Sequence, residues 1–61
     1  MTPKEIKAAE ALLRDWQGHV DAKDKLEYHV GKINGLVAFL EDCGCFVYQN
    51  SDGLYAIRNG K

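Results

Sequence analysis

The sequence lacks a strong net charge and any long apolar run. Its eight Lys and Arg residues are scattered among nine Asp and Glu, giving a formal net charge of −1. Without a strong positive field a chain attracts phosphate backbones weakly, so nucleic-acid binding is disfavoured, though it stays an alternative. No apolar stretch approaches the roughly 20 residues that a membrane-spanning helix needs. The amino-terminal MTPKEIKAAE also has charged residues where a secretory signal would have an apolar core. We therefore expect a cytoplasmic protein with no membrane partner.

Cysteine is scarce as well, and the two cysteines are poorly placed for a disulfide. Cys43 and Cys45 flank a single glycine, so a bridge between them would close a small, strained ring. Together with His19 and His29 they are the candidate zinc ligands, but their spacing matches neither the cysteine pairs nor the histidine pairs of structural zinc sites. We expect reduced thiols, no metal and no cofactor.

A catalytic signature is also missing. A Cys/His nucleophile pair needs an orienting third group and an oxyanion loop, and neither is evident. A chain of 61 residues leaves little room for a pocket of ligand-binding size. We expect no enzymatic activity and no small-molecule substrate.

What the chain does contain is the composition of a folded globular protein, with 46% hydrophobic and 28% charged residues. We assign residues 1–61 to a single small domain. At this length one core only marginally offsets the roughly 1.5 kcal/mol of conformational entropy lost per residue. A protein partner or self-association would supply further stabilisation.

The clearest local signal is a helix start at the amino terminus. Thr2 suits the N-cap, Pro3 the first helical position, and Glu5 the acid of a capping box. A narrow apolar stripe follows, which includes Leu13 and the predicted core residue Trp16. Gly18 predicts the end of this helix, and the short connection after it predicts that the second helix turns back antiparallel to the first.

The longest element is a predicted second helix from Asp21 to Gly44. Asp21 is its expected N-cap, Asp24 its capping-box acid, and Gly44 the left-handed residue that ends it. Apolar residues alternate at spacings of four and three and form one seam. This seam comprises Leu26, Val30, Ile33, Val37 and Leu40.

The apolar arc of this helix is too wide for a single partner helix to cover. Gly31, Gly35 and Ala38 form a small-residue patch beside Tyr28 and Phe39. Each helix-interior glycine costs about 1 kcal/mol relative to alanine. That cost suggests a close approach at the patch. The covering group is expected to come from the same chain, with a second protomer as the alternative.

Asn34 and Gly35 are also a turn signal, which leaves a split into two helices as an alternative to one continuous helix. The split would give the element order of a winged-helix DNA-binding domain, with a carboxy-terminal hairpin as the wing. The segment 36–43 would then be the recognition helix. It is apolar and acidic, whereas a groove reader needs Arg, Lys, Asn or Gln.

After Gly44 the pattern becomes extended: CFVYQ, the turn NSDG, and LYAIR. A type I turn followed by left-handed Gly53 pairs Gln49 with Tyr55 and Val47 with Ile57. One face of the hairpin then carries Cys45, Val47, Tyr55 and Ile57, and the other carries Phe46, Tyr48, Leu54 and Ala56. Both faces are apolar, so one face or edge remains for a partner.

The sequence therefore predicts an α+β fold, in which an antiparallel helical hairpin is followed by a C-terminal β-hairpin that packs on the long second helix. The tail, residues 59–61, is expected to fray. The favoured function is a small non-enzymatic protein-protein interaction module, acting as a homodimer or as an inhibitor or adaptor of a larger protein. The candidate partner-binding residues are Tyr28, Gly31, Gly35, Phe39, Phe46, Tyr48, Leu54 and Arg58.

Overall fold

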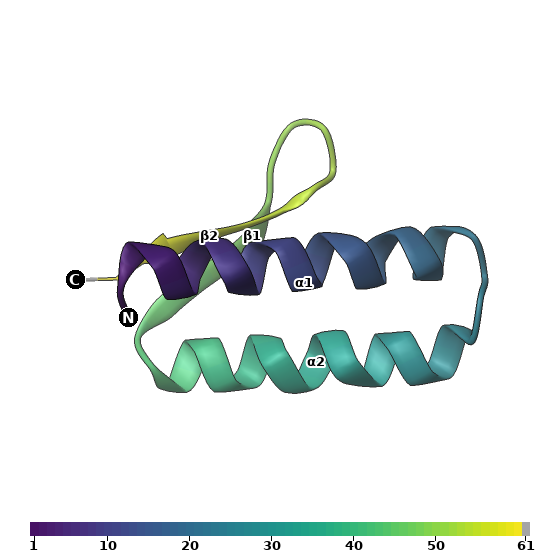
Figure 1. The fold of residues 1–61 in the computed structure, drawn as a ribbon, viewed down its shortest axis with the longest axis horizontal. Helices are drawn as coiled ribbons and strands as arrows, with labels where there is room; N and C mark the ends of the chain where they lie inside the picture. Colours follow the sequence, from purple (N-terminus) through teal and green to yellow (C-terminus); the bar gives the residue numbers. More distant parts are fainter. Residues whose placement is uncertain (61) are drawn as a thin grey trace.

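Two helices and a two-stranded antiparallel sheet follow one another along the chain (Figure 1). The computed structural model describes residues 1–60. The two helices run antiparallel, side by side, and the hairpin packs against one face of this pair, with β2 on α1 and β1 on α2. This confirms the predicted small α+β fold. The elements are α1 (Pro3–Asp21), α2 (Leu26–Asp42), β1 (Cys45–Gln49) and β2 (Tyr55–Asn59).

The predicted start of α1 is confirmed in every detail. The Thr2 N–H donates to Glu5 Oε1 at 2.9 Å, and the Glu5 N–H donates to Thr2 Oγ1 at 3.2 Å. Pro3 occupies the first turn. Two amides that have no partner within the helix are thus bonded reciprocally.

The predicted boundary between the helices is wrong. α1 runs through Gly18 and ends at Asp21, so Asp21 closes the first helix instead of capping the second. Asp24 is not a capping-box acid, because its carboxylate bonds to the His19 ring at 2.9 Å. The connection uses two residues with left-handed backbone, Lys23 (φ 57°) and Lys25 (φ 45°), and Lys25 begins α2 without a side-chain cap.

A buried histidine bonds to carbonyl groups of the connection just before α2. His29 Nδ1 lies 2.8 Å from the carbonyl oxygen of Asp24 and 3.1 Å from that of Lys25. Because both partners are acceptors, Nδ1 carries the proton. The ring stacks on His19 of α1 with centroids 4.3 Å apart and an angle of 8° between the planes. The connection is therefore held by hydrogen bonds from the first turns of α2 and by one ring stack between the helices.

The second helix is continuous. Asn34 and Gly35 lie inside α2, so the alternative split there is wrong, as is the expected start at Asp21. Gly44, with φ 83°, supplies the predicted left-handed residue after the helix. Neither helix within residues 1–60 is long and apolar enough to span a membrane.

The hairpin has the predicted register, with Gln49 opposite Tyr55 and Val47 opposite Ile57. Gly53 has φ 78°, as its turn position requires. The inward face is the one that carries Cys45, Val47, Tyr55 and Ile57. The buried core lies between this face and the helices, and consists of Ala9, Leu13, Ile33, Leu40, Cys45 and Ile57.

The predicted frayed tail is wrong for the residues that the structure describes. Asn59 belongs to β2 and lies opposite Cys45. Gly60 follows so close to the turn after α2 that a Cβ atom there would come within 2.0 Å of the Gly44 carbonyl oxygen. The tail prediction for Lys61 lies outside the described residues.

Candidate binding surfaces

Large apolar side chains remain exposed on two surfaces of the molecule. On α2 the exposed fractions are 60% for Tyr28 and 56% for Phe39. On the hairpin they are 64% for Phe46, 48% for Tyr48 and 40% for Leu54. Single exposed apolar residues occur on every protein surface. Several large ones grouped on one face of a small chain are more typical of a binding surface.

The first surface is the outward face of the hairpin. Phe46, Tyr48 and Arg58 line a shallow hollow there. Phe46 and Arg58 are cross-strand partners, so a basic residue and an exposed aromatic residue line the same hollow. Ala56 shares this face but is only 8% exposed, opposite the larger Tyr48. We call Phe46, Tyr48, Leu54 and Arg58 the hairpin face.

The turn beside the hairpin face is firmly held. Asn50 Oδ1 accepts hydrogen bonds from the N–H groups of Asp52 and Leu54, each at 3.0 Å. The Asn50 carbonyl oxygen accepts from the Gly53 N–H at 2.9 Å. Leu54 is therefore exposed on an ordered turn, where it is available for contact without prior folding.

The second surface is the α2 patch, which consists of Tyr28, Gly31, Gly35 and Phe39. A Cβ atom added at either glycine would meet nothing within 4 Å among the described residues. The expectation that another part of the same chain covers this patch is therefore wrong. The hairpin packs on a different face of α2, where it covers Leu40 and Ile33 instead.

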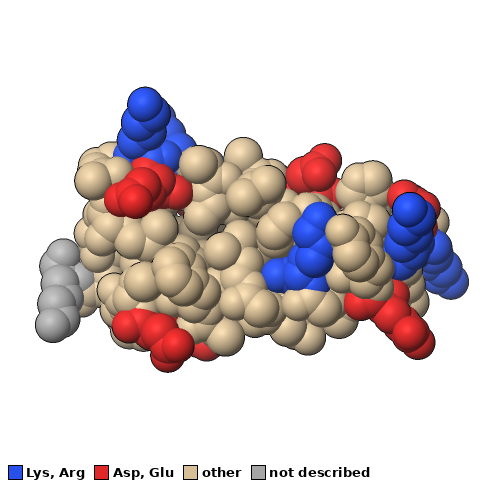
Figure 2. Space-filling view, turned by 60° about the horizontal axis from the view of Figure 1, so that its bottom comes forward, with Lys and Arg blue, Asp and Glu red and all other residues tan. Residues whose placement is uncertain are grey.

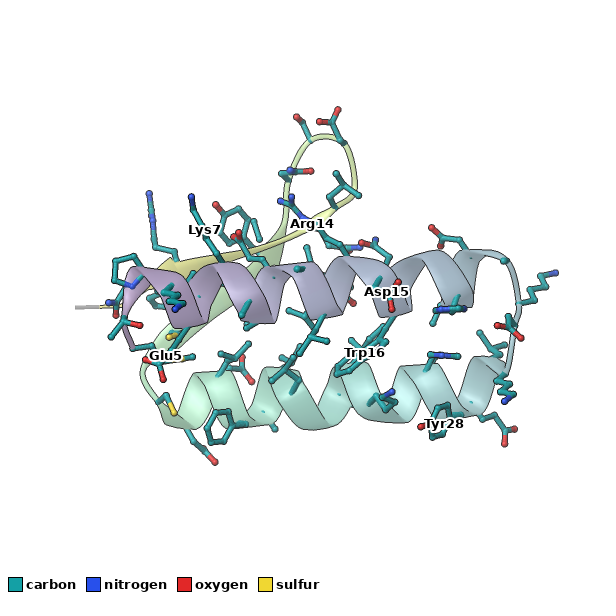
Figure 3. All side chains as sticks on the ribbon, in the orientation of Figure 1. Glu5, Lys7, Arg14, Asp15, Trp16 and Tyr28 are labelled. Carbon is teal, nitrogen blue, oxygen red and sulfur yellow. The ribbon has the colours of Figure 1, made fainter. Side chains whose placement is uncertain are left out.

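One lysine links this patch to the neighbouring helix. Lys32 Nζ lies 4.6 Å from the ring centroid of Trp16 on α1 and 4.8 Å from that of Tyr28 on α2. Figure 3 labels both aromatic residues. Trp16 packs against the core as predicted but is only half-buried. Leu12 on α1 is 47% exposed. In Figure 2, which brings α2 forward, charged side chains stand mostly toward the two ends and uncharged ones fill most of the middle.

Sequence reasoning missed the residues that seal the outer edge of β2. The main-chain N–H of Ile57 donates to Glu10 Oε2 at 2.8 Å, and that of Tyr55 donates to Gln17 Oε1 at 3.3 Å. Arg14, which points toward the hairpin in Figure 3, donates from Nε to the Tyr55 carbonyl oxygen at 2.8 Å. α1 therefore occupies the positions that a third strand would fill.

The candidate metal ligands form two separate pairs: His19 stacks on His29 near the start of α2, and Cys43 and Cys45 lie just after its end. Cys43 is exposed, Cys45 is buried, and both are free thiols. His29 is committed to the carbonyl oxygens of the connection between the helices. Within residues 1–60 no three His, Cys, Asp or Glu side chains lie close enough together to hold a metal ion.

Comparison of the chain with protein-family models, with curated proteins and with solved structures finds no match.

Proposed function

We propose that this protein is a small, non-enzymatic interaction module that binds another protein chain through the hairpin face and the α2 patch. The observation that carries the proposal is the grouped exposure of Tyr28, Phe39, Phe46 and Tyr48. Burying such side chains contributes roughly 25 cal/mol per Å² of apolar surface removed from water. Aromatic residues and arginine are also the residue types that dominate interface energetics.

The hairpin face combines exposed apolar side chains with a charged one, which is typical of a binding site. Its apolar rings are accompanied by Arg58, a side chain suited to pair with a carboxylate or stack on a ring of the partner. The ordered turn beside it keeps the entropic cost of binding low.

The α2 patch supports the same function by a different geometry. Two exposed glycines on one helix allow a partner's backbone to approach closely. Lys32 lies over the rings of Trp16 and Tyr28, so a positive charge stands at the border of the patch and could pair with an acidic group of the partner.

The winged-helix alternative finds less support. It depended on a break at Asn34–Gly35 that would create a recognition helix, and α2 is continuous through both residues. Arg58, its wing residue, stands beside Phe46. The net charge of −1 leaves little attraction for phosphate.

A reducing compartment such as the cytoplasm is the setting that we propose for the protein. Cys43 is an exposed free thiol, and in an oxidising compartment such thiols form intermolecular disulfides.

Photo-crosslinking tests the proposed function. A photoreactive phenylalanine analogue replaces Tyr48 or Phe39 in the protein as expressed in cells, and the matched control carries it at Lys4, an exposed site on α1 outside both surfaces. We expect crosslinked protein from Tyr48 or Phe39 and little from Lys4. Equal yields at all three positions, or none at Tyr48 and Phe39, would rule out an interaction through these surfaces.

A further inference from the structure

The geometry points to a specific occupant of the free sheet edge: β1 pairs antiparallel with β1 of a second copy, which makes a four-stranded sheet across a two-fold axis at Val47. This inference rests on the proposed function and names its partner. The two edges of the sheet are unequal, because α1 seals the edge of β2 with Glu10, Arg14 and Gln17. In the part of the chain that the structure describes, no side chain hydrogen-bonds to the outer edge of β1 in this way.

The hydrogen-bond pattern shows which groups of β1 are free. The Asn50 N–H bonds to the Leu54 carbonyl oxygen at 2.9 Å at the end of the ladder. Bonded and non-bonded pairs alternate in an antiparallel ladder, so Tyr48 and Phe46 point their main-chain groups toward β2. Val47 and Gln49 point theirs away. Among residues 1–60 these outward groups make no hydrogen bond.

The sequence of β1 does nothing to block this edge. Exposed edge strands are usually protected by a charged residue, a proline or a bulge. The strand CFVYQ contains no charge and no proline, and its pairing with β2 is regular along its whole length. An unprotected edge in a folded protein is a template for another strand.

β1 is complementary to itself in one register. With Val47 on the two-fold axis, the outward N–H and C=O groups of Val47 hydrogen-bond to those of Val47 in the second copy. Cys45 then lies opposite Gln49 of the second copy. Phe46 then lies opposite Tyr48 of the second copy in a non-hydrogen-bonded pair, with Cα atoms about 4.5 Å apart. Aromatic cross-strand pairs of this kind stabilise sheets. Two exposed rings of each copy thereby gain a neighbour.

A second copy fits this edge better than an unrelated strand. An uncharged strand meets itself without like-charge repulsion. The same two-fold operation would satisfy both free edges at once and close the assembly as a dimer, with no edge left to grow.

Sedimentation of the full chain from roughly 1 μM to 1 mM tests the inference. Val47→Pro removes the outward N–H without touching the ladder to β2, since Val47 and Ile57 are a non-hydrogen-bonded pair. Because the dimer is symmetric, the substitution removes two hydrogen bonds between the copies. We therefore expect the dimerisation affinity to fall on the order of 10-fold. Ser51→Pro is the matched control. It places a proline at the second position of the turn, where proline is favoured, and leaves the free edge of β1 unchanged.

A pair of exposed substitutions tests the register and does not depend on proline being tolerated. Phe46→Lys and Tyr48→Glu each weaken self-association, because either variant as a homodimer loses both Phe46–Tyr48 pairs. Mixed in equal amounts, the two variants form a heterodimer in which the lysine faces the glutamate and one aromatic pair survives. We expect this heterodimer to exceed either homodimer several-fold.

The inference is supported if wild type and Ser51→Pro dimerise, Val47→Pro dimerises more weakly while it keeps its circular dichroism, and the mixture favours the heterodimer. A monomer over the whole range overturns it. A dimer that survives Val47→Pro and the two exposed substitutions, but not Phe39→Ser, also overturns it and assigns association to the α2 patch. In both cases the crosslinks at Tyr48 and Phe39 decide separately whether the proposed function stands.

Discussion

Glu10 on α1 accepts a hydrogen bond of 2.8 Å from the main-chain N–H of Ile57 on the outer edge of β2. Ile57 belongs to the buried core, and this hydrogen bond is part-buried. A carboxylate that accepts from such an N–H makes a charge-assisted bond, stronger than a neutral one. The acid therefore both anchors the hairpin on α1 and prevents a strand from pairing with β2.

Replacement of Glu10 by alanine should destabilise the protein by about 1–3 kcal/mol, because the Ile57 N–H would lose its partner. Glu10→Gln keeps an acceptor oxygen and should cost less. Urea unfolding measures both losses, and amide exchange at Ile57 should accelerate in the alanine variant. An equal free energy of unfolding for wild type and Glu10→Ala would contradict this, because it would show that water bonds to the Ile57 N–H as well as the carboxylate does.

His29→Ala should also cost about 1–3 kcal/mol, since the carbonyl oxygens of Asp24 and Lys25 would lose the Nδ1 proton that holds the connection. His19→Ala removes only the stacked ring and its bond to the exposed Asp24 carboxylate, and should cost less. Thermal unfolding compares the two variants. The explanation of the connection fails if His19→Ala is the more damaging change.

The open α2 patch predicts a gain of stability. Gly35→Ala should stabilise the isolated protein by about 1 kcal/mol, because a methyl group there meets nothing in the described chain and alanine is the better helix former. Gly31→Ala should do the same. A loss of stability on denaturant unfolding of the monomer would mean that some group packs against the patch.

A pH dependence follows from the amino-terminal capping box. The hydrogen bond from the Thr2 main chain, aided by the Thr2 side chain, holds the pKa of Glu5 below its ordinary value of 4.5. A lowered pKa in the folded state gives stabilisation that is present above pH 4.5 and is lost as the pH falls through the folded-state pKa. Glu5→Gln should therefore flatten the acid limb of stability measured against pH. An unchanged slope would show that Glu5 contributes nothing there.

Local signals in the sequence predicted those parts of the fold that local interactions determine. Thr2 and Glu5 cap α1 because their partners are three residues away. Gly44 and Gly53 adopt positive φ where the turn chemistry requires it. The hairpin register followed from that turn, and it also placed Val47 and Ile57 on one face.

Side-chain contacts that the local patterns do not encode decided what the sequence did not reveal. The boundary after α1 was misplaced because α1 continues past Gly18 to Asp21, and the connection is held by His29 and its stacking on His19, with Asp21 playing no part as an N-cap. The β2 edge was missed because Glu10 and Ile57 are 47 residues apart. A polar stripe of Glu10, Arg14 and Gln17 at helical spacing was visible and could have indicated a helix flank beside a strand.

The candidate binding residues were chosen for excess apolar surface, and the structure places them on two separate surfaces. Tyr28 and Phe39 flank the glycines of the α2 patch, while Tyr48 and Arg58 belong to the hairpin face. Their role in binding stays a prediction. The free edge of β1 could not be read from composition, because it depends on which edge α1 seals.

The most direct measurement is a dilution series of ¹⁵N–¹H spectra of the full chain, with amide exchange at each concentration. If a second copy covers the apolar surface through β1, the amides of Val47 and Gln49 should shift and become protected as concentration rises. The amides of Phe46 and Tyr48, bonded to β2 throughout, should stay protected. Spectra that superimpose at every concentration, with Val47 always in fast exchange, would contradict the account.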